Sequence, residues 1–212
     1  LNYILSCRAA KGDLPENPVV VKTIVTTDLA ARIAEKYGCE VVEVLTGFKY
    51  IGEQIGLLEK TGHPERYIFG FEESYGYLSG SYVRDKDGVV ASMLICEMAA
   101  YYRKQGKSLL QVLENVYAEF GVFRHSLINA EFEGASGMAA MQQLMTSLRE
   151  NRPASIAGLK VVRFSDYQAS EQTDLLTGRI VHLDLPKSNV LSFGLEGDAG
   201  VIVRPSGTEP KI

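Results

Sequence analysis

The sequence lacks the features from which several common classes of protein are predicted. Its three cysteines lie far apart and form no CxxC pair, which argues against a disulfide framework and against a zinc site. Its three histidines are equally scattered and indicate no metal cluster. Basic residues number 22 against 26 acidic ones, so no excess of positive charge points to nucleic acid or an anionic membrane as a partner.

Long apolar runs and well-known nucleotide or hydrolase motifs are also missing. The longest apolar stretch, "VVASMLICEMAAYY", contains Glu97 and has helical periodicity, so it is not a membrane span. No secretory signal, Walker loop, GxGxxG fingerprint or Ser-His-Asp arrangement is present. We therefore expect a cytoplasmic protein whose cysteines are small buried hydrophobic residues in a reducing compartment.

What is present is the composition of an ordinary globular protein. The chain has 212 residues, of which 46% are hydrophobic and 23% charged, enough for one large domain or two small ones. Its beginning, "LNYILSCRAA", resembles a helix entered partway through, and its end, "VIVRPSGTEPKI", resembles a strand about to begin again. We expect the chain to be truncated at both ends.

Apolar runs and helical periodicity alternate in the first half of the chain. β-branched or apolar stretches at 18–25, 39–45 and 66–72 predict strands. The stretches between them predict helices, the first capped by Asp28. Two more helices should follow, the second opened by Ser108 and Gln111 at capping-box spacing and ended by Gly121. This order predicts an α/β domain, a parallel sheet with flanking helices, over residues 1–121.

The second half changes to consecutive short strands around one helix. That helix, at 136–151, should turn an apolar stripe inward, formed by Met138, Met141, Met145 and Leu148. The other expected elements are strands, at 122–134, 159–167, 179–185, 189–197 and 200–206. The pattern predicts an α+β antiparallel domain over residues 122–212.

The stretch "RPSGTEPK" near the end of the chain is dense in groups that bind phosphate. Arg204 offers a planar fork of donors, and Ser206 and Thr208 add hydroxyls. Gly207 leaves backbone N–H groups open to an anion. The glutamate that follows would have to point away from the anion or pair with the lysine two residues later. These residues form either a phosphate cradle or a plain β-turn, since Pro, Ser and Gly are also turn residues.

Three further stretches carry polar groups at places where ligands bind. "GFEESYG" follows the third predicted strand, and its Glu72 and Ser74 could accept hydrogen bonds from sugar hydroxyls. The alternative is a solvated loop in which one of the two glutamates caps a backbone group. "LTGFKYIG" opens a helix, where Thr46, Gly47 and Lys49 could meet an anion or form an ordinary N-cap.

The fourth stretch, "RDKDG", contains Lys86. By itself it is typical of a charged turn before a helix. Lys86 gains a functional meaning only if it points at the same cleft as the other groups.

Together these stretches resemble the α-D-phosphohexomutases, over nearly the whole chain. "RPSGTEPK" is similar to that family's phosphate-binding loop, and "FEESYG" is similar to its sugar-recognition loop. The order of "TTDLA", "TGFKYIG" and "RDKDG" around them resembles the phosphoglucomutase branch, which includes phosphopentomutase-like members. The resemblance implies that the first half corresponds to the family's third domain and the second half to its fourth.

The resemblance also implies what each stretch does. Arg204, Ser206, Gly207 and Thr208, with Lys86, match the phosphate site. Glu72 and Ser74, with Thr46, Gly47 and Lys49, match the sugar contacts. The family interconverts hexose 1-phosphate and hexose 6-phosphate through a phosphoserine and a bisphosphate intermediate. The substrate implied is a small phosphosugar.

Two motifs of the family are absent from the sequence. Neither a serine motif resembling TASHNP nor a DGDxDR-type metal loop occurs. The resemblance therefore implies no catalytic residue and no metal ligand in this chain. Mg²⁺ and a glucose 1,6-bisphosphate-type activator would act in a full-length parent, and the missing N-terminal domains of the same chain would be its partners. The alternatives are a phosphopentomutase of the same superfamily and a non-catalytic phosphosugar-binding module.

Overall fold

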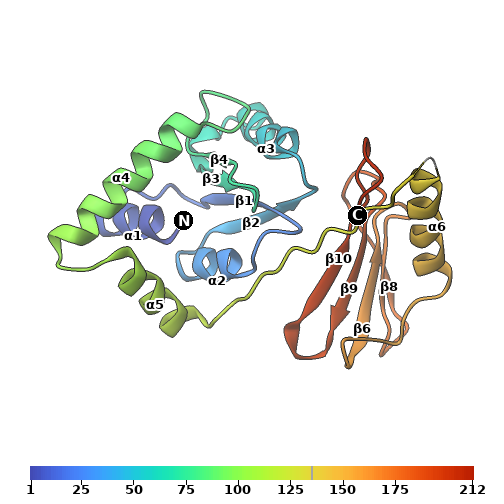
Figure 1. Cartoon of the computed structure of the whole chain (residues 1–212). Coiled ribbons are helices and arrows are strands. Elements are labelled where there is room, and N and C mark those ends of the chain that lie inside the picture. The colour runs from blue at the N-terminus through green and yellow to red at the C-terminus, as the bar shows by residue number, and fades with distance from the viewer. Residues whose placement is uncertain (135) are drawn as a thin grey trace. The chain divides into compact units, whose positions relative to one another are not determined.

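The computed structural model describes residues 1–134 and 136–212 of the chain. The chain forms two compact units, Leu1–His125 and Ser126–Ile212 (Figure 1). The first unit contains a four-stranded sheet with helices, and the second contains an antiparallel sheet with one α-helix. The expected succession of an α/β fold and an antiparallel α+β fold is confirmed.

Helices and strands alternate in the first unit up to its third strand, and the fourth strand follows the third directly. Its strands lie in the order β2-β1-β3-β4, with β1 parallel to both of its neighbours. Its elements are α1 (Asn2–Lys11), β1 (Val19–Thr23), α2 (Leu29–Lys36), β2 (Glu40–Val44), α3 (Phe48–Lys60), a 3₁₀ turn (Pro64–Arg66), β3 (Tyr67–Phe71), β4 (Tyr77–Leu78), α4 (Gly88–Lys104) and α5 (Leu109–Phe120).

The sheet is mixed, which corrects the prediction of a purely parallel one. β4 runs antiparallel to β3. The reason is the tight return between them, where the Glu72 N–H donates to the Gly76 carbonyl oxygen over 2.9 Å. A two-residue strand at the edge of a sheet gives little periodicity, so the sequence did not predict it.

Alternate residues of β1 pack on opposite faces of the sheet. Val20 joins the apolar cluster that contains Leu5 of α1 and Ile33 of α2, whereas Val21 joins the cluster that contains Ile51 of α3. Every residue of β1 is buried. This confirms the interpretation of the β-branched run as a strand covered on both faces.

Helix starts in the first unit follow the expected chemistry in one case and depart from it in another. Ser108 and Gln111 form the complete capping box of α5. Asp28, expected to cap α2, makes no capping hydrogen bond. Its carboxylate instead accepts a hydrogen bond from the Lys22 ammonium, at 3.0 Å, and this ion pair replaces the cap.

The second unit places α6 against one antiparallel sheet. The strand order is β10-β9-β6-β7-β8, with β5 paired to β6. The elements are α6 (Gly137–Glu150), β5 (Ser155–Ile156), β6 (Leu159–Asp166), β7 (Glu171–Asp174), β8 (Ile180–His182), β9 (Leu191–Leu195), a 3₁₀ turn (Glu196–Asp198) and β10 (Gly200–Val203).

Some expectations for the second unit are wrong. Met141 and Met145 of α6 are fully buried as expected, but Met138, in the first turn of the helix, is 41% exposed. β7, "EQTD", was not predicted because it contains no apolar residue. The expected strand at 122–134 is an extended segment, and among the described residues its only ladder contact is one bridge between Glu131 and Lys211.

The three cysteines were expected to be buried. Cys39 is buried, but Cys7 is half-buried and Cys96 is exposed, so burial of all three is wrong. Cys96 lies on the outer side of α4, where sequence periodicity alone does not distinguish an exposed apolar stripe from a buried one.

Across residues 1–134 and 136–212, no helix has the length and apolarity needed to cross a membrane.

The capping box of α5 gives the first test. We expect Ser108→Ala to lower the free energy of unfolding by about 1 kcal/mol, because the backbone N–H of Gln111 loses its acceptor. Ser92→Ala in α4 is the matched control. The Ser92 hydroxyl only bonds back to the Gly88 carbonyl within the helix, so its loss should be neutral or slightly stabilising. Urea unfolding measures both, and equal stabilities of the two variants would contradict the prediction.

Candidate functional site

Two of the predicted loops meet at the carboxyl edge of the first sheet. Glu72 follows β3, and Gly47 precedes α3 after the end of β2. The Gly47 N–H donates to Oε1 of Glu72 over 2.8 Å, although the two residues are 25 positions apart. The Glu72 side chain is nearly buried, with the residue 8% exposed. One Glu72 oxygen therefore satisfies a backbone N–H, as in the capping alternative, and the other stays available to a ligand.

Glycines make this meeting of loops possible. Gly47 has φ 130 and ψ 120, a conformation that side-chain-bearing residues rarely adopt. A Cβ on Gly76 would lie 3.0 Å from the Phe48 ring and 3.2 Å from Oε2 of Glu72. The return of the 72–76 loop thus packs against the first residue of α3, beside the Glu72 carboxylate.

Lys86 lies next to the same phenyl ring. Its ammonium nitrogen is 5.8 Å from the centroid of Phe48 and 3.2 Å from a carboxylate oxygen of Asp85. The backbone N–H and then the ammonium of Lys86 lower the pKa of Asp85. The Asp87 N–H donates to the Tyr77 carbonyl over 2.8 Å, which ties this turn to β4. Lys86 therefore belongs to the same group of loops as Gly47 and Glu72.

The other predicted residues of these loops differ in their surroundings. Oγ1 of Thr46 is buried, and it has no hydrogen-bond partner among the described residues. The Lys49 ammonium lies 4.7 Å from the centroid of the neighbouring Tyr50 ring, and Lys49 itself is exposed. Ser74 is also exposed, near the tip of its loop. In the described part of the chain, no hydrogen bond or ion pair joins these three side chains to Glu72.

The loop at the end of the chain is ordered by its own serine. Oγ of Ser206 accepts hydrogen bonds from the backbone N–H groups of Thr208, at 3.4 Å, and Glu209, at 3.2 Å. The Ser206 N–H donates to the Lys211 carbonyl over 2.8 Å, which closes the loop. These bonds are those of a turn, so the turn alternative describes the loop's backbone as the structure has it.

Charge and space around this loop leave it open to an anion. Within residues 1–134 and 136–212, no hydrogen bond or ion pair engages the exposed Arg204 guanidinium. A Cβ on Gly207 would have no neighbour within 4 Å. Glu209 forms an ion pair with Lys211, one of the two arrangements expected for it, and the hydrogen bond between them raises the pKa of Lys211. The charge of this glutamate is therefore paired with a lysine rather than with the Arg204 guanidinium.

The base of the terminal loop is held by the extended segment that precedes α6. Ala130 and Ile212 exchange two backbone hydrogen bonds of 2.9 Å, and the Phe132 N–H donates to the Pro210 carbonyl over 2.8 Å. A Cβ on Gly137 would approach the Phe132 carbonyl oxygen to 2.1 Å. The loop that carries Arg204 is therefore fixed at its foot, and its tip is exposed.

Three residues near the first group of loops were not predicted as site residues. Glu73, next to Glu72, places Oε2 3.2 Å from the Thr23 hydroxyl and 3.3 Å from the Thr26 hydroxyl. The two hydroxyls are 2.9 Å apart. The available signal was the polar "TTD", which contains Thr26 and directly follows a buried strand; it was interpreted as the start of a helix and as part of the family resemblance, without a site role.

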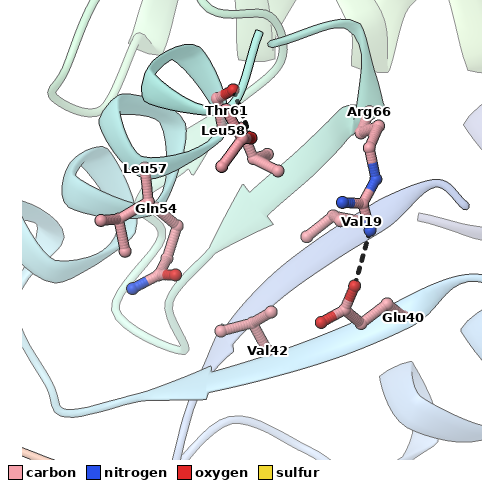
Figure 2. Close-up of a pocket in the computed structure, with 8 residues that line it drawn as sticks. All are labelled: Val19, Glu40, Val42, Gln54, Leu57, Leu58, Thr61 and Arg66. Atoms are coloured by element: carbon pink, nitrogen blue, oxygen red, sulfur yellow. Dashed lines mark hydrogen bonds and ion pairs between the residues drawn. The ribbon is translucent and has the colours of Figure 1, made fainter. Parts of the chain in front are cut away.

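A pocket elsewhere in the first unit contains none of the predicted residues (Figure 2). Its volume is about 170 Å³, and it lies at the amino ends of β1 and β2, opposite the loops described above. Arg66 crosses it to bond Glu40 over 2.7 Å. Its lining residues are Val19, Glu40, Val42, Gln54, Leu57, Leu58, Thr61 and Arg66.

In the described part of the chain, no group of three or more His, Cys, Asp or Glu side chains could hold a metal ion.

The predicted site residues fall into two sets. One set lies around Gly47, Glu72 and Lys86 in the first unit, and the other lies at 204–211 in the second.

Comparisons with known proteins agree on one family. Residues 1–120 match the family model described as "Phosphoglucomutase/phosphomannomutase, alpha/beta/alpha domain III". A phosphoglucomutase of Staphylococcus epidermidis is 36% identical over 210 residues, covering 99% of this chain and 38% of the relative. A phosphoglucomutase of Staphylococcus aureus is 37% identical over 209 residues, covering 99% of this chain and 37% of the relative. The chain thus spans well under half the length of these curated relatives.

A solved structure shares the fold. The phosphoglucomutase pp63/parafusin from Paramecium, in its open form, aligns with a TM-score of 0.61 at 20% sequence identity. The alignment covers 98% of this chain and 34% of that one. Both units of the chain therefore have the fold of a segment of that larger protein.

The bond between Gly47 and Glu72 generates the second test. We expect Glu72→Ala to lower the free energy of unfolding of the first unit by about 1–3 kcal/mol, because the Gly47 N–H loses a charged acceptor. Glu72→Gln keeps a carbonyl oxygen at this position and should lose clearly less. Thermal unfolding followed by circular dichroism compares the three proteins. A Glu72→Ala variant as stable as the parent would show that the bond contributes nothing.

Proposed function

Because this chain belongs to the phosphoglucomutase/phosphomannomutase family, we propose that it is the substrate-recognition part of a phosphohexomutase. The longer protein would interconvert hexose 1-phosphate and hexose 6-phosphate through a phosphoserine and a bisphosphate intermediate. The observation that carries the proposal is the match of residues 1–120 to the family's third domain. The meeting of Gly47 and Glu72 supports it, because two loops predicted separately to contact the sugar are in direct contact.

In this proposal the terminal loop holds the phosphate that does not react. The Arg204 guanidinium would form paired hydrogen bonds to phosphate oxygens, and the backbone around Gly207 leaves room for the anion. Ser206 and Thr208 would add hydroxyl donors. Binding energy from a phosphate that does not react can position the reacting hydroxyl, which lowers the activation barrier.

The loops of the first unit would hold the sugar. Glu72 keeps one carboxylate oxygen for a sugar hydroxyl, since its other oxygen accepts from Gly47. Ser74, Thr46 and Lys49 would contribute from the same loops, and Lys86 would approach the phosphate. Oγ1 of Thr46 is buried and has no hydrogen-bond partner among the described residues, so a bound sugar would reach it only if the loop moved.

The catalytic serine and Mg²⁺ would belong to the longer protein. The described side chains offer no cluster of His, Cys, Asp or Glu that fits a metal ion. An activator of the glucose 1,6-bisphosphate type would likewise act in the longer protein. A cytoplasmic location and inactivity of this chain by itself are parts of the proposal. A phosphopentomutase of the same superfamily and a non-catalytic phosphosugar-binding module are the competing functions.

A titration of the chain tests the phosphate assignment. We expect inorganic phosphate and glucose 1-phosphate to shift the amide resonances of residues 204 and 206–208, and Arg204→Ala to weaken binding roughly 10- to 150-fold. This range corresponds to the loss of about 1.5–3 kcal/mol of charge-assisted hydrogen bonding. Arg179→Ala, which removes another exposed arginine of the second unit, is the matched control and should bind normally. Resonances at 204 and 206–208 that stay unmoved while others respond would overturn the assignment.

A titration with ribose 1-phosphate compares the phosphohexomutase with the phosphopentomutase. Ribose 1-phosphate binding more tightly than glucose 1-phosphate would favour the phosphopentomutase. A coupled assay with glucose 1-phosphate should show no turnover by the chain alone, with or without Mg²⁺. Turnover by the purified chain would contradict the proposed division between recognition and catalysis.

A further inference from the structure

Glu73 lies beside a predicted sugar ligand but faces a different part of the sheet. Glu72 is directed to Gly47, after β2, whereas Glu73 is directed to Thr23 and Thr26, at the end of β1. We propose that Glu73 is a positioning residue, whose carboxylate fastens the 72–76 loop to the end of β1 through these two threonine hydroxyls. The part of this inference that concerns sugar binding rests on the proposed function.

The two threonines that hold Glu73 are buried and fixed. Thr23 is 0% exposed and Thr26 is 4% exposed. The Thr26 N–H donates to the Thr23 carbonyl over 3.0 Å, and the Thr26 carbonyl accepts from the Lys22 ammonium at 3.2 Å. Because both main-chain groups of Thr26 are bonded, its hydroxyl has a set position when Glu73 approaches. The anchor is therefore the last residue of β1 together with a buried turn that is bonded to that strand.

Counting protons shows why a carboxylate suits this place. The three oxygens form three close pairs, but two threonine hydroxyls supply only two protons. Two arrangements satisfy both hydroxyls: each donates to the carboxylate, or one donates to the other, which donates to the carboxylate. Without the carboxylate, one buried O–H would lose its acceptor, which is unfavourable. An ionised Glu73 thus completes the group as an acceptor only.

The 72–76 loop contains a backbone conformation that needs support from its surroundings. Tyr75, at the tip, has φ 62, a left-handed conformation that is uncommon for a bulky residue, and it is 86% exposed. Such a conformation persists where the surroundings enforce it. The bonds of Glu72 and Glu73 hold the loop on one side of Tyr75, and β4 holds it on the other. The adjacent carboxylates thus set how the loop presents Ser74 and the second oxygen of Glu72.

The paired substitution of Thr23 and Thr26 by Val tests the anchor, because Val keeps the branched shape and removes the hydroxyl. In the double variant we expect amide hydrogen exchange of residues 72–78 to rise tenfold or more, while exchange in β1 and β2 stays unchanged. The double substitution by Ser restores the hydroxyls and should restore slow exchange. Glu73→Ala, a change at an exposed residue, should produce the same fast exchange even where the double Val variant fails to fold.

Ligand binding distinguishes positioning from a purely structural role. We expect the double Val variant to lose fivefold or more in affinity for glucose 1-phosphate and to keep its affinity for inorganic phosphate, with the double Ser variant close to the parent. Exchange at 72–78 that is unchanged in both the double Val variant and Glu73→Ala would overturn the anchor. Faster exchange with unchanged glucose 1-phosphate affinity would overturn its role in positioning.

The proposed function can fail separately from the anchor. If the unmodified chain binds neither glucose 1-phosphate nor inorganic phosphate, the proposed function is contradicted. The exchange rates, measured without ligand, still decide whether Glu73 fastens the loop.

Discussion

A lysine ammonium buried in the central strand of the first sheet organises the edge at which the candidate site lies. Lys22 of β1 is 0% exposed, and its three protons have three acceptors: the Thr26 carbonyl at 3.2 Å, Asp28 at 3.0 Å and Glu43 at 2.5 Å. A buried ammonium without partners would be strongly destabilising. The partner carboxylates keep much of their contact with water, with side chains 73% and 50% exposed. Most of the cost of desolvation therefore falls on the lysine.

This arrangement ties three elements together where the strands end. Glu43 belongs to β2, Asp28 precedes α2, and Thr26 lies in the turn between β1 and α2. The turn then offers the Thr26 hydroxyl to Glu73, in the loop after β3. Charge pairing within the sheet is thus continued by hydrogen bonds into a loop that the sheet alone would not fix. Many polar side chains at the carboxyl edge of the sheet are used to hold loops in place. Only polar atoms that are not engaged in these bonds can bind a ligand.

Much of the fold could be predicted, because it depends on patterns local in sequence. The strand β1 is recognisable from its own β-branched composition, and the capping box of α5 joins residues only three positions apart, Ser108 and Gln111. The wrong predictions concern features that depend on distant partners. The segment at 122–134 alternates like a strand, yet its described ladder contact is a single bridge to Lys211. Asp28 is a residue type that caps helices and lies at the N-cap position, but its carboxylate forms an ion pair with Lys22 of β1 instead.

The candidate site follows the same division. Gly47 and Glu72 could be proposed separately, since each lies just after a predicted strand, but nothing in the sequence pairs them. The hydrogen bonds of Glu73 could not be predicted because its partners lie 50 and 47 residues away. Under the proposed function this distribution has a reason. A sugar that must bind in two orientations needs a small set of contacts whose positions do not shift. Adjacent carboxylates bonded to different parts of the sheet restrict such a loop more than either bond alone.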